Sequence, residues 1–238
     1  MNLPNVFEEN PRPKIKIYNI NLEEKYVLLT PPRTGSRRSL LISERLNFNT
    51  YKSVNGVLEF HAKGTTHNHT HDLFNGHEEF KIIMTCRNPY SVMVTEFKHS
   101  LGTSETIKTN FNLHSLFSDF VYDFYETNAS SWYSPTAFRF REELTNRKID
   151  YRIRLENMFE DYCKVPLIKD SEIYFDGTLK SLTDEVIGSH LEHKNLKHLN
   201  NLPKDFRDYY NKESSDFMKS KFYNLFEFMD YDMDSWNQ

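Results

Sequence analysis

The sequence has few cysteines and no long apolar segment. Cys86 and Cys163 are the only cysteines among 238 residues, too few for a disulfide framework and typical of a reducing compartment. The N-terminal residues contain no apolar signal core, and no window of the chain approaches the length and hydrophobicity of a membrane span. We therefore expect a soluble, cytoplasmic protein with no membrane span.

Neither sign of charge dominates the composition. The formal net charge is −4 and the pI is about 6.2, which argues against a general nucleic-acid or membrane-surface binder. Aromatic residues make up 15% of the chain, so we expect a core that depends on Phe and Tyr. We predict an N-terminal arm over residues 1–13, which contain three prolines, and a single α/β domain over residues 14–238.

Residues 26–45 combine a strand, a tight turn and the start of a helix. Their sequence is YVLLTPPRTGSRRSLLISER, in which two prolines end an apolar run and Gly35 permits a turn. Free amides and the positive end of the helix dipole meet at such a helix start, and Arg33, Arg37 and Arg38 add charge. We predict a site for a phosphate or sulfate group here. The segment lacks the Walker A pattern of P-loop nucleotide-binding proteins. The alternative interpretation is an ordinary turn with surface arginines.

Hydrophobic periodicity predicts strands that alternate with helices. Besides the strand that begins at residue 26, we expect strands at residues 14–18 (an edge strand), 57–61, 80–86 and 150–155. Helices are expected from about residue 37 and at residues 90–101, 113–126, 137–147, 156–162 and 204–229. We expect no regular structure at residues 102–112 and 164–182.

This alternation indicates a parallel sheet covered on both faces, which binds ligands at the carboxyl ends of its strands. Three segments rich in charged or histidine residues follow predicted strands, and we expect them to meet at one edge of the sheet. They are residues 31–38, 67–72 and 87–90.

Arg87 directly follows the buried strand predicted at residues 80–86. A charge in this position is expected to meet an anion or a carboxylate. Thr95 lies eight residues later, which is about two turns into the predicted helix. The alternative interpretations are a salt bridge for Arg87 and an ordinary helical threonine at position 95.

Half of the ten histidines lie between positions 61 and 77. His67, His69 and His71 alternate with other residues, so on an extended segment they share a face. Such a group can supply a general base near neutral pH, or it can bind a metal. The third interpretation is a polar loop whose histidines have no special role.

Together these segments resemble the sulfotransferase superfamily that uses 3′-phosphoadenosine 5′-phosphosulfate (PAPS), its carbohydrate-type branch more than its cytosolic branch. Residues 30–38, TPPRTGSRR, resemble the family's 5′-phosphosulfate loop, and residues 87–95, RNPYSVMVT, resemble its 3′-phosphate motif. Residues 151–157, YRIRLEN, resemble its R-x-E-[DN] segment, and the closing DYD segment resembles its C-terminal ending. These matches follow one another in order over most of residues 25–231.

The resemblance implies a P-loop-like three-layer sandwich with a central, mainly parallel sheet flanked by helices. It implies transfer of a sulfuryl group from PAPS to a hydroxyl acceptor, preferably a saccharide, with PAP as the product. The cofactor-binding residues that it implies are Arg33, Thr34, Gly35, Ser36, Arg37, Arg38, Arg87 and Thr95. It also implies that Arg33 stabilises the leaving oxygen and that His69 is the base, with a slip to His67 or His71 left open. No metal is required.

The chain departs from the family pattern at two points. Arg33 occupies a position where lysine is more frequent, and the C-terminal R-K-G motif of the cytosolic branch is absent. Contacts to the 3′-phosphate from that end are therefore not predicted.

Two other functions remain open. One is a metal-dependent hydrolase that uses His67, His69, His71 and Asp72 as its ligands. The other is a non-catalytic module that binds PAP or a sulfated glycan through the same arginines. The sequence indicates neither the acceptor nor the oligomeric state.

Overall fold

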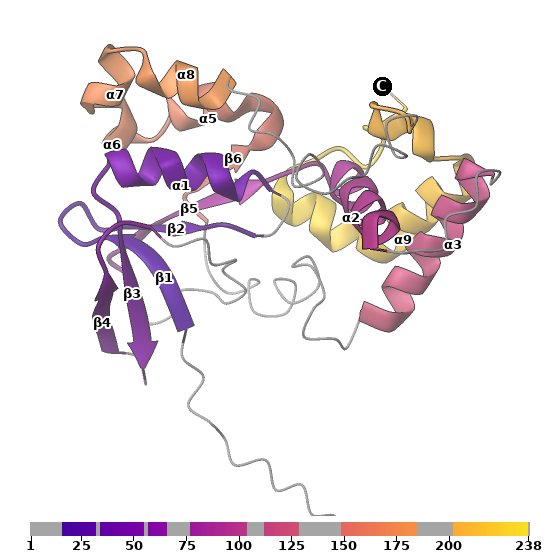
Figure 1. Cartoon of the computed structure of the whole chain (residues 1–238), viewed down its shortest axis with the longest axis horizontal. Helices are drawn as coiled ribbons and strands as arrows, with labels where there is room; N and C mark the ends of the chain where they lie inside the picture. Colours follow the sequence, from indigo (N-terminus) through magenta and orange to yellow (C-terminus); the bar gives the residue numbers. More distant parts are fainter. Residues whose placement is uncertain are drawn as a thin grey trace, which may run out of the picture.

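A computed structural model shows an α/β protein with one mixed sheet and two groups of helices (Figure 1). It describes residues 16–31, 34–54, 57–65, 77–103, 112–128, 149–184 and 202–237. The six strands of this part of the chain are β1 (Lys16–Asn21), β2 (Tyr26–Leu29), β3 (Asn49–Val54), β4 (Val57–Ala62), β5 (Lys81–Cys86) and β6 (Tyr151–Arg154).

The order of the strands across the sheet is β4-β3-β1-β2-β5-β6. β2, β5 and β6 are parallel neighbours, whereas β1 is antiparallel to both β2 and β3, and β3 is antiparallel to β4. The prediction of a mainly parallel sheet is therefore not confirmed. The physical reason is the short link at residues 22–25, because a parallel pair needs a longer crossover connection. The prediction of an edge strand at residues 14–18 is wrong, since β1 lies inside the sheet.

Most of the predicted helices in the described ranges are present. The α-helices are α1 (Ser36–Arg45), α2 (Pro89–Thr103), α3 (Leu113–Asn128), α5 (Met158–Tyr162), α6 (Pro166–Lys169), α7 (Glu172–Phe175), α8 (Thr178–Asp184) and α9 (Lys212–Met229). Two 3-10 turns, η2 (Leu155–Asn157) and η4 (Phe206–Tyr209), accompany them in the described ranges. None of the helices in the described ranges combines the length and hydrophobicity needed to cross a membrane. The helix expected at residues 137–147 lies outside the described residues.

Two predictions about helices need correction. Residues 164–182 are not irregular, because the short helices α6 and α7 and most of α8 lie there. The long helix expected at residues 204–229 is divided into η4 and α9. The division falls at Asn211, whose side chain accepts a hydrogen bond from the backbone N–H of Ser214 and so begins a new helix.

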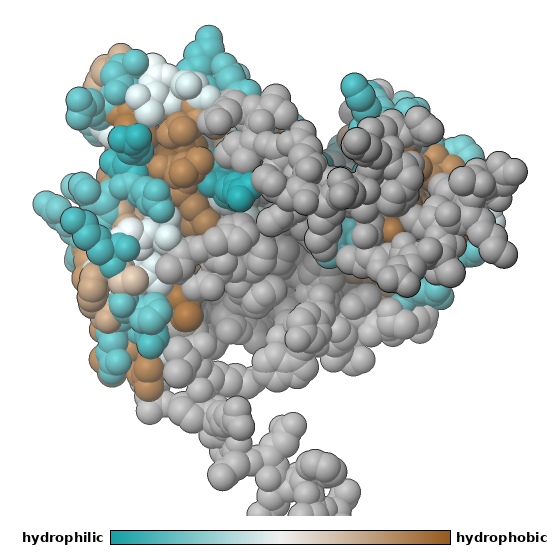
Figure 2. Space-filling model, viewed as in Figure 1, coloured by the Kyte–Doolittle hydropathy of each residue, from teal (hydrophilic) through white to brown (hydrophobic). Residues whose placement is uncertain are grey.

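Two clusters of buried side chains lie on opposite faces of the sheet. Alternate residues of β2 face opposite ways, so Val27 and Leu29 join one cluster, and Tyr26 and Leu28 join the other. The first cluster includes buried residues of α2, α3 and α9, and the second includes those of α1 and α5–α8. Figure 1 shows the same two groups of helices, one beside α1 and one around α2. On the face seen in Figure 2, hydrophobic residues gather between α1 and α8.

Candidate functional site

The parallel strands β2, β5 and β6 end at the same edge of the sheet, which we call the carboxyl edge. The register places Leu29 beside Met84 and Cys86 beside Arg154. The chain leaves this edge through the turn before α1, through the turn that contains Arg87, and through η2. Two of the segments that the sequence predicts to meet, the arginine-rich turn and the Arg87 turn, therefore start at the same edge.

Thr34 and Thr85 connect the turn before α1 to β5. Their side chains are buried, and their Oγ1 atoms lie 2.6 Å apart. The Thr34 hydroxyl donates its one hydrogen to the carbonyl oxygen of Pro31, so the hydroxyl of Thr85 is the donor to Thr34. Because Thr85 precedes Arg87 by two residues, this contact fixes the position of one predicted motif relative to the other.

Gly35 is required at the next position for two reasons. Its φ angle is +86°, in the left-handed region that side chains disfavour. A Cβ atom there would also lie 2.8 Å from Leu155 Cδ1 and 3.0 Å from Met158 Cε. The turn therefore packs directly against η2 and α5, which follow β6.

Helix α1 begins at the carboxyl edge with an open N-terminus. Gly35 occupies the N-cap, no side chain of the described residues caps the helix, and its first turn has no acidic residue. The first backbone N–H with a helical partner is that of Ser39, which donates to the carbonyl of Gly35. The preceding amides, together with the helix dipole, have the arrangement that binds anions at helix N-termini.

The three residues of this first turn differ in their surroundings. Ser36 is buried and Arg37 is exposed. Arg38 is half-buried, and its Nη1 donates to the carbonyl oxygen of Thr183 over 3.1 Å, which connects α1 to α8. Arg38 therefore supports the turn as well as adding charge, whereas Arg37 extends into solvent.

Arg87 lies just before α2 and contacts a serine in the first turn of that helix. Its Nε donates to the Oγ of Ser91 over 2.8 Å. The Thr95 hydroxyl donates instead to the backbone carbonyl of Ser91 over 2.9 Å. Sequence reasoning missed Ser91, although its spacing of four residues from Arg87 places it one helical turn away.

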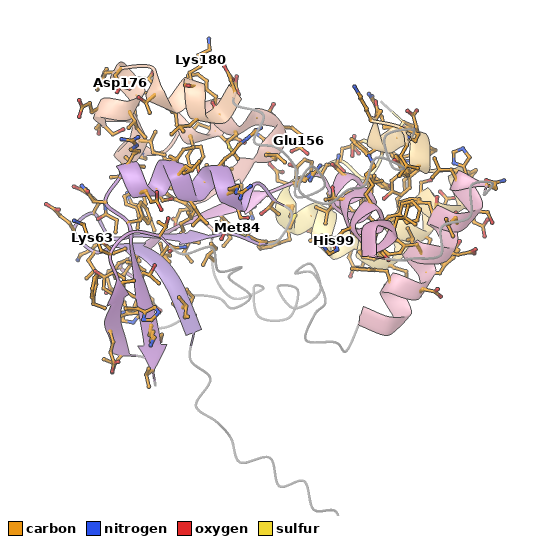
Figure 3. All side chains as sticks on the ribbon, in the orientation of Figure 1. Lys63, Met84, His99, Glu156, Asp176 and Lys180 are labelled. Atoms are coloured by element: carbon orange, nitrogen blue, oxygen red, sulfur yellow. The ribbon has the colours of Figure 1, made fainter. Side chains whose placement is uncertain are left out.

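Glu156 joins three segments at the carboxyl edge. Its Oε1 accepts a hydrogen bond from the backbone N–H of Asn88 over 3.1 Å, and its Oε2 accepts one from the Tyr231 hydroxyl over 2.5 Å. Burial, together with the charge of Glu156, raises the pKa of Tyr231. The side-chain amide of Asn88 donates to Ser235 Oγ over 2.9 Å. Glu156 therefore holds the Arg87 turn and the C-terminal segment in place; Figure 3 shows it between the two groups of helices.

Arg154 pairs with Asp161 in a two-pronged ion pair. Nε and Nη2 of Arg154 donate to the two carboxylate oxygens of Asp161, each over 2.9 Å, and Lys164 donates to the same carboxylate. Burial alone would raise the pKa of Asp161, but the hydrogen bonds from Arg154 and Lys164 outweigh it and lower the pKa. Arg154 thus orders the end of β6.

The strand that precedes the histidine-rich segment runs away from the carboxyl edge. After β4, the Thr65 hydroxyl donates to Glu44 in the last turn of α1, over 3.0 Å. That end of α1 lies at the amino end of β2, because Asn21, which pairs with Tyr26, donates to the carbonyl of Leu46. Figure 3 shows Lys63 and Glu156 near opposite ends of α1.

The segment after the histidines returns to the same amino end of the sheet. The backbone N–H of Lys81, the first residue of β5, donates to the carbonyl of Lys25 just before β2. The expectation that the strand before residues 67–72 ends at the carboxyl edge is therefore wrong, because β4 runs antiparallel to β3 and so toward the amino end of β2.

Several predicted site residues lie outside the described part of the chain: Arg33, His67, His69, His71 and Asp72. Their assigned roles stay predictions. Within the described part, no three His, Cys, Asp or Glu residues are grouped so that they could hold a metal ion. Comparison of the chain with protein-family models, with curated proteins and with solved structures finds no match.

Proposed function

We propose that the chain is a sulfotransferase that moves a sulfuryl group from PAPS to a hydroxyl acceptor. The observation that carries this proposal is the buried contact between Thr34 and Thr85. It brings together the two segments that resemble the 5′-phosphosulfate loop and the 3′-phosphate motif. The proposal includes a P-loop-like, three-layer arrangement around β2, β5 and β6, which the buried clusters on both faces of the sheet support.

The residues present at the carboxyl edge fit a nucleotide with two separate anionic groups. In this proposal the 5′-phosphosulfate binds the first-turn amides of α1, which no described side chain caps, with help from Arg37. The 3′-phosphate binds Arg87, whose guanidinium is oriented by Ser91. Gly35 matters for the first group because a side chain there would collide with Leu155.

The chemistry of transfer depends on position and charge. PAPS, when bound, supplies the sulfuryl group and a phosphate leaving group. The amides of α1 and the guanidinium of Arg33 are proposed to stabilise the negative charge that develops on the leaving oxygen. Arg33 acts as a hydrogen-bond donor and not as an acid, because guanidinium does not give up its proton readily. His69 is proposed to remove the proton of the acceptor hydroxyl, which we propose belongs to a saccharide.

One observation favours the non-catalytic alternative, a module that binds PAP or a sulfated glycan without transfer. The described residues on both sides of the histidine segment, Thr65 and His77, lie toward the amino end of β2 and β5. In this alternative the arginine sites bind the nucleotide, but no histidine serves as the base.

A thermal-shift panel with PAP, PAPS, ATP and zinc tests the nucleotide site. We expect PAP and PAPS at about a hundred times their dissociation constants to stabilise the fold by roughly 2.7 kcal/mol, which raises the melting temperature by roughly 5–10 °C. ATP lacks a 3′-phosphate, so at the same concentration as PAP it is expected to raise the melting temperature less. Stabilisation by zinc alone would contradict the proposal and favour the metal-dependent hydrolase.

Transfer of labelled sulfate from PAPS to a panel of saccharides and other alcohols tests catalysis. His69→Ala is expected to reduce transfer by about a hundredfold or more, the usual contribution of a general base, while PAP still binds. His61→Ala is the matched control, because His61 is an exposed histidine on β4. Binding of PAP without transfer to any acceptor supports the non-catalytic module, and equal losses in both variants would exclude His69 as the base.

A further inference from the structure

One side of α2 carries a row of polar side chains that begins at Arg87. Ser91, Thr95 and Lys98 are spaced by four and then three residues, so they lie on one side of the helix. Arg87 bonds to the Ser91 side chain, and Thr95 bonds to the Ser91 carbonyl. Lys98 extends the row one turn further along the helix.

The surroundings of Lys98 hold its ammonium group in place without neutralising it. Nζ donates to the carbonyl oxygen of Pro203 over 2.9 Å and lies 5.0 Å from the centre of the Tyr209 ring. The side chain is half-buried, and no carboxylate of the described residues forms an ion pair with it. An ammonium group has three hydrogens to donate, and the Pro203 carbonyl takes one.

Lys98 is also close enough to Arg87 for their charges to interact. Burial lowers the pKa of Lys98, and the positive charge of Arg87 lowers it further. An anion bound between these two cations would remove the repulsion that Lys98 experiences from Arg87.

We propose that Lys98 is a further binding residue for the 3′-phosphate, and this inference rests on the proposed function. Arg87 and Lys98 together supply two positive groups, one at the start of α2 and one about two to three turns along it. Lys98 therefore contributes to the preference for nucleotides that carry a 3′-phosphate.

The test is the preference for PAP, which is the dissociation constant of adenosine 5′-phosphate divided by that of PAP. Both constants are measured by titration calorimetry. The two ligands differ by the 3′-phosphate, so their ratio isolates its contribution. In Lys98→Gln the amide can still donate to Pro203, but the charge is gone. We expect this variant to lower the ratio by about tenfold, the size of a lost charge-assisted hydrogen bond, while the affinity for adenosine 5′-phosphate stays unchanged. Lys169→Gln is the matched control, because Lys169 is an exposed lysine on α6.

The outcomes separate this inference from the proposed function. If the wild-type protein prefers PAP and Lys98→Gln keeps the full preference, Lys98 is not a 3′-phosphate ligand, although the proposed function stands. If Lys98→Gln weakens both nucleotides equally, its role is structural and the inference is overturned. If the wild-type protein binds PAP no better than adenosine 5′-phosphate, the proposed function fails and the assignment of Lys98 fails with it.

Discussion

Gly35 stands where the turn before α1 meets the residues that follow β6. Replacing it with alanine would add strain from the positive φ angle and a Cβ 2.8 Å from Leu155 Cδ1. Gly177 has a similar φ of +81°, but a Cβ there would meet nothing within 4 Å. The two glycines therefore separate backbone strain from side-chain overlap.

We predict that Gly35→Ala lowers the free energy of unfolding by about 2–4 kcal/mol, of which the backbone accounts for about 1–2 kcal/mol. Gly177→Ala should lower it by only about 1–2 kcal/mol. Urea denaturation of both variants measures the difference. Equal losses would show that the contact with Leu155 does not constrain the turn.

Asp161 stabilises the fold in a pH-dependent way, because its pKa is lower in the folded protein than in the unfolded chain. Its contribution is complete above the unfolded pKa of about 3.9 and decreases as the pH falls toward the folded-state value. At neutral pH, Asp161→Asn should lower the free energy of unfolding by about 2–3 kcal/mol, less than for a fully buried pair, since Lys164 is largely exposed.

The measurement is urea denaturation of the wild type and the variant at pH 7 and pH 3. The difference between the two proteins should be smaller at pH 3, because the unfolded chain takes up a proton at Asp161 below its pKa of about 3.9, before the folded protein does. Asp216→Asn is the control, because Asp216 pairs with Lys212 on the exposed side of α9, and it should change stability little. A difference at Asp161 that does not change with pH would contradict the ion-pair assignment.

At the scale of the secondary-structure elements, the C-terminal segment after α9 lies against the Arg87 turn and is hydrogen-bonded to it. The Tyr231 hydroxyl bonds to Glu156, Ser235 bonds to Asn88, and the Tyr90 hydroxyl donates to the carbonyl of Met233 over 2.7 Å. These contacts connect residues that are far apart in sequence. The position of Arg87 therefore depends on the last residues of the described chain.

We predict that Tyr231→Phe lowers the free energy of unfolding by only about 1 kcal/mol, the usual effect of one lost hydrogen bond. It should nevertheless weaken PAP binding severalfold, because Glu156 then has one fewer partner to orient it. Tyr174→Phe on α7 is the control; the Tyr174 ring contacts Phe175. Calorimetric titration with PAP checks the prediction, and unchanged affinity in Tyr231→Phe would contradict it.

The sequence predicts some elements well and others poorly, for physical reasons. β2 and β5 are apolar and buried on both faces, so their composition identifies them. β3, whose sequence is NTYKSV, was not predicted, because it is polar and is held by pairing with β1 and β4. The available signal was Asn55-Gly56 between Val54 and Val57, a typical hairpin pair. The helices α6 and α7 are single turns, too short for a periodic pattern.

At the scale of the whole molecule, the sheet has a parallel half with the candidate site and an antiparallel half without it. The sequence predicted that the turn before α1 and the Arg87 turn share an edge, because both follow apolar strands. It could not predict the direction of β4, which is determined by antiparallel pairing with β3, and so it misassigned the edge of the sheet at which β4 ends. Ser91 is one helical turn from Arg87, a local spacing that the sequence contains, whereas Glu156 reaches the Asn88 backbone through a tertiary contact that no local pattern encodes.

A crystal structure of the protein with bound PAP tests most directly whether these two turns hold one nucleotide. We predict that the 5′-phosphate contacts the backbone amides of Ser36, Arg37 and Arg38, and that the 3′-phosphate contacts Arg87. PAP bound away from the carboxyl edge, or bound there with neither phosphate on these groups, would contradict the proposed function.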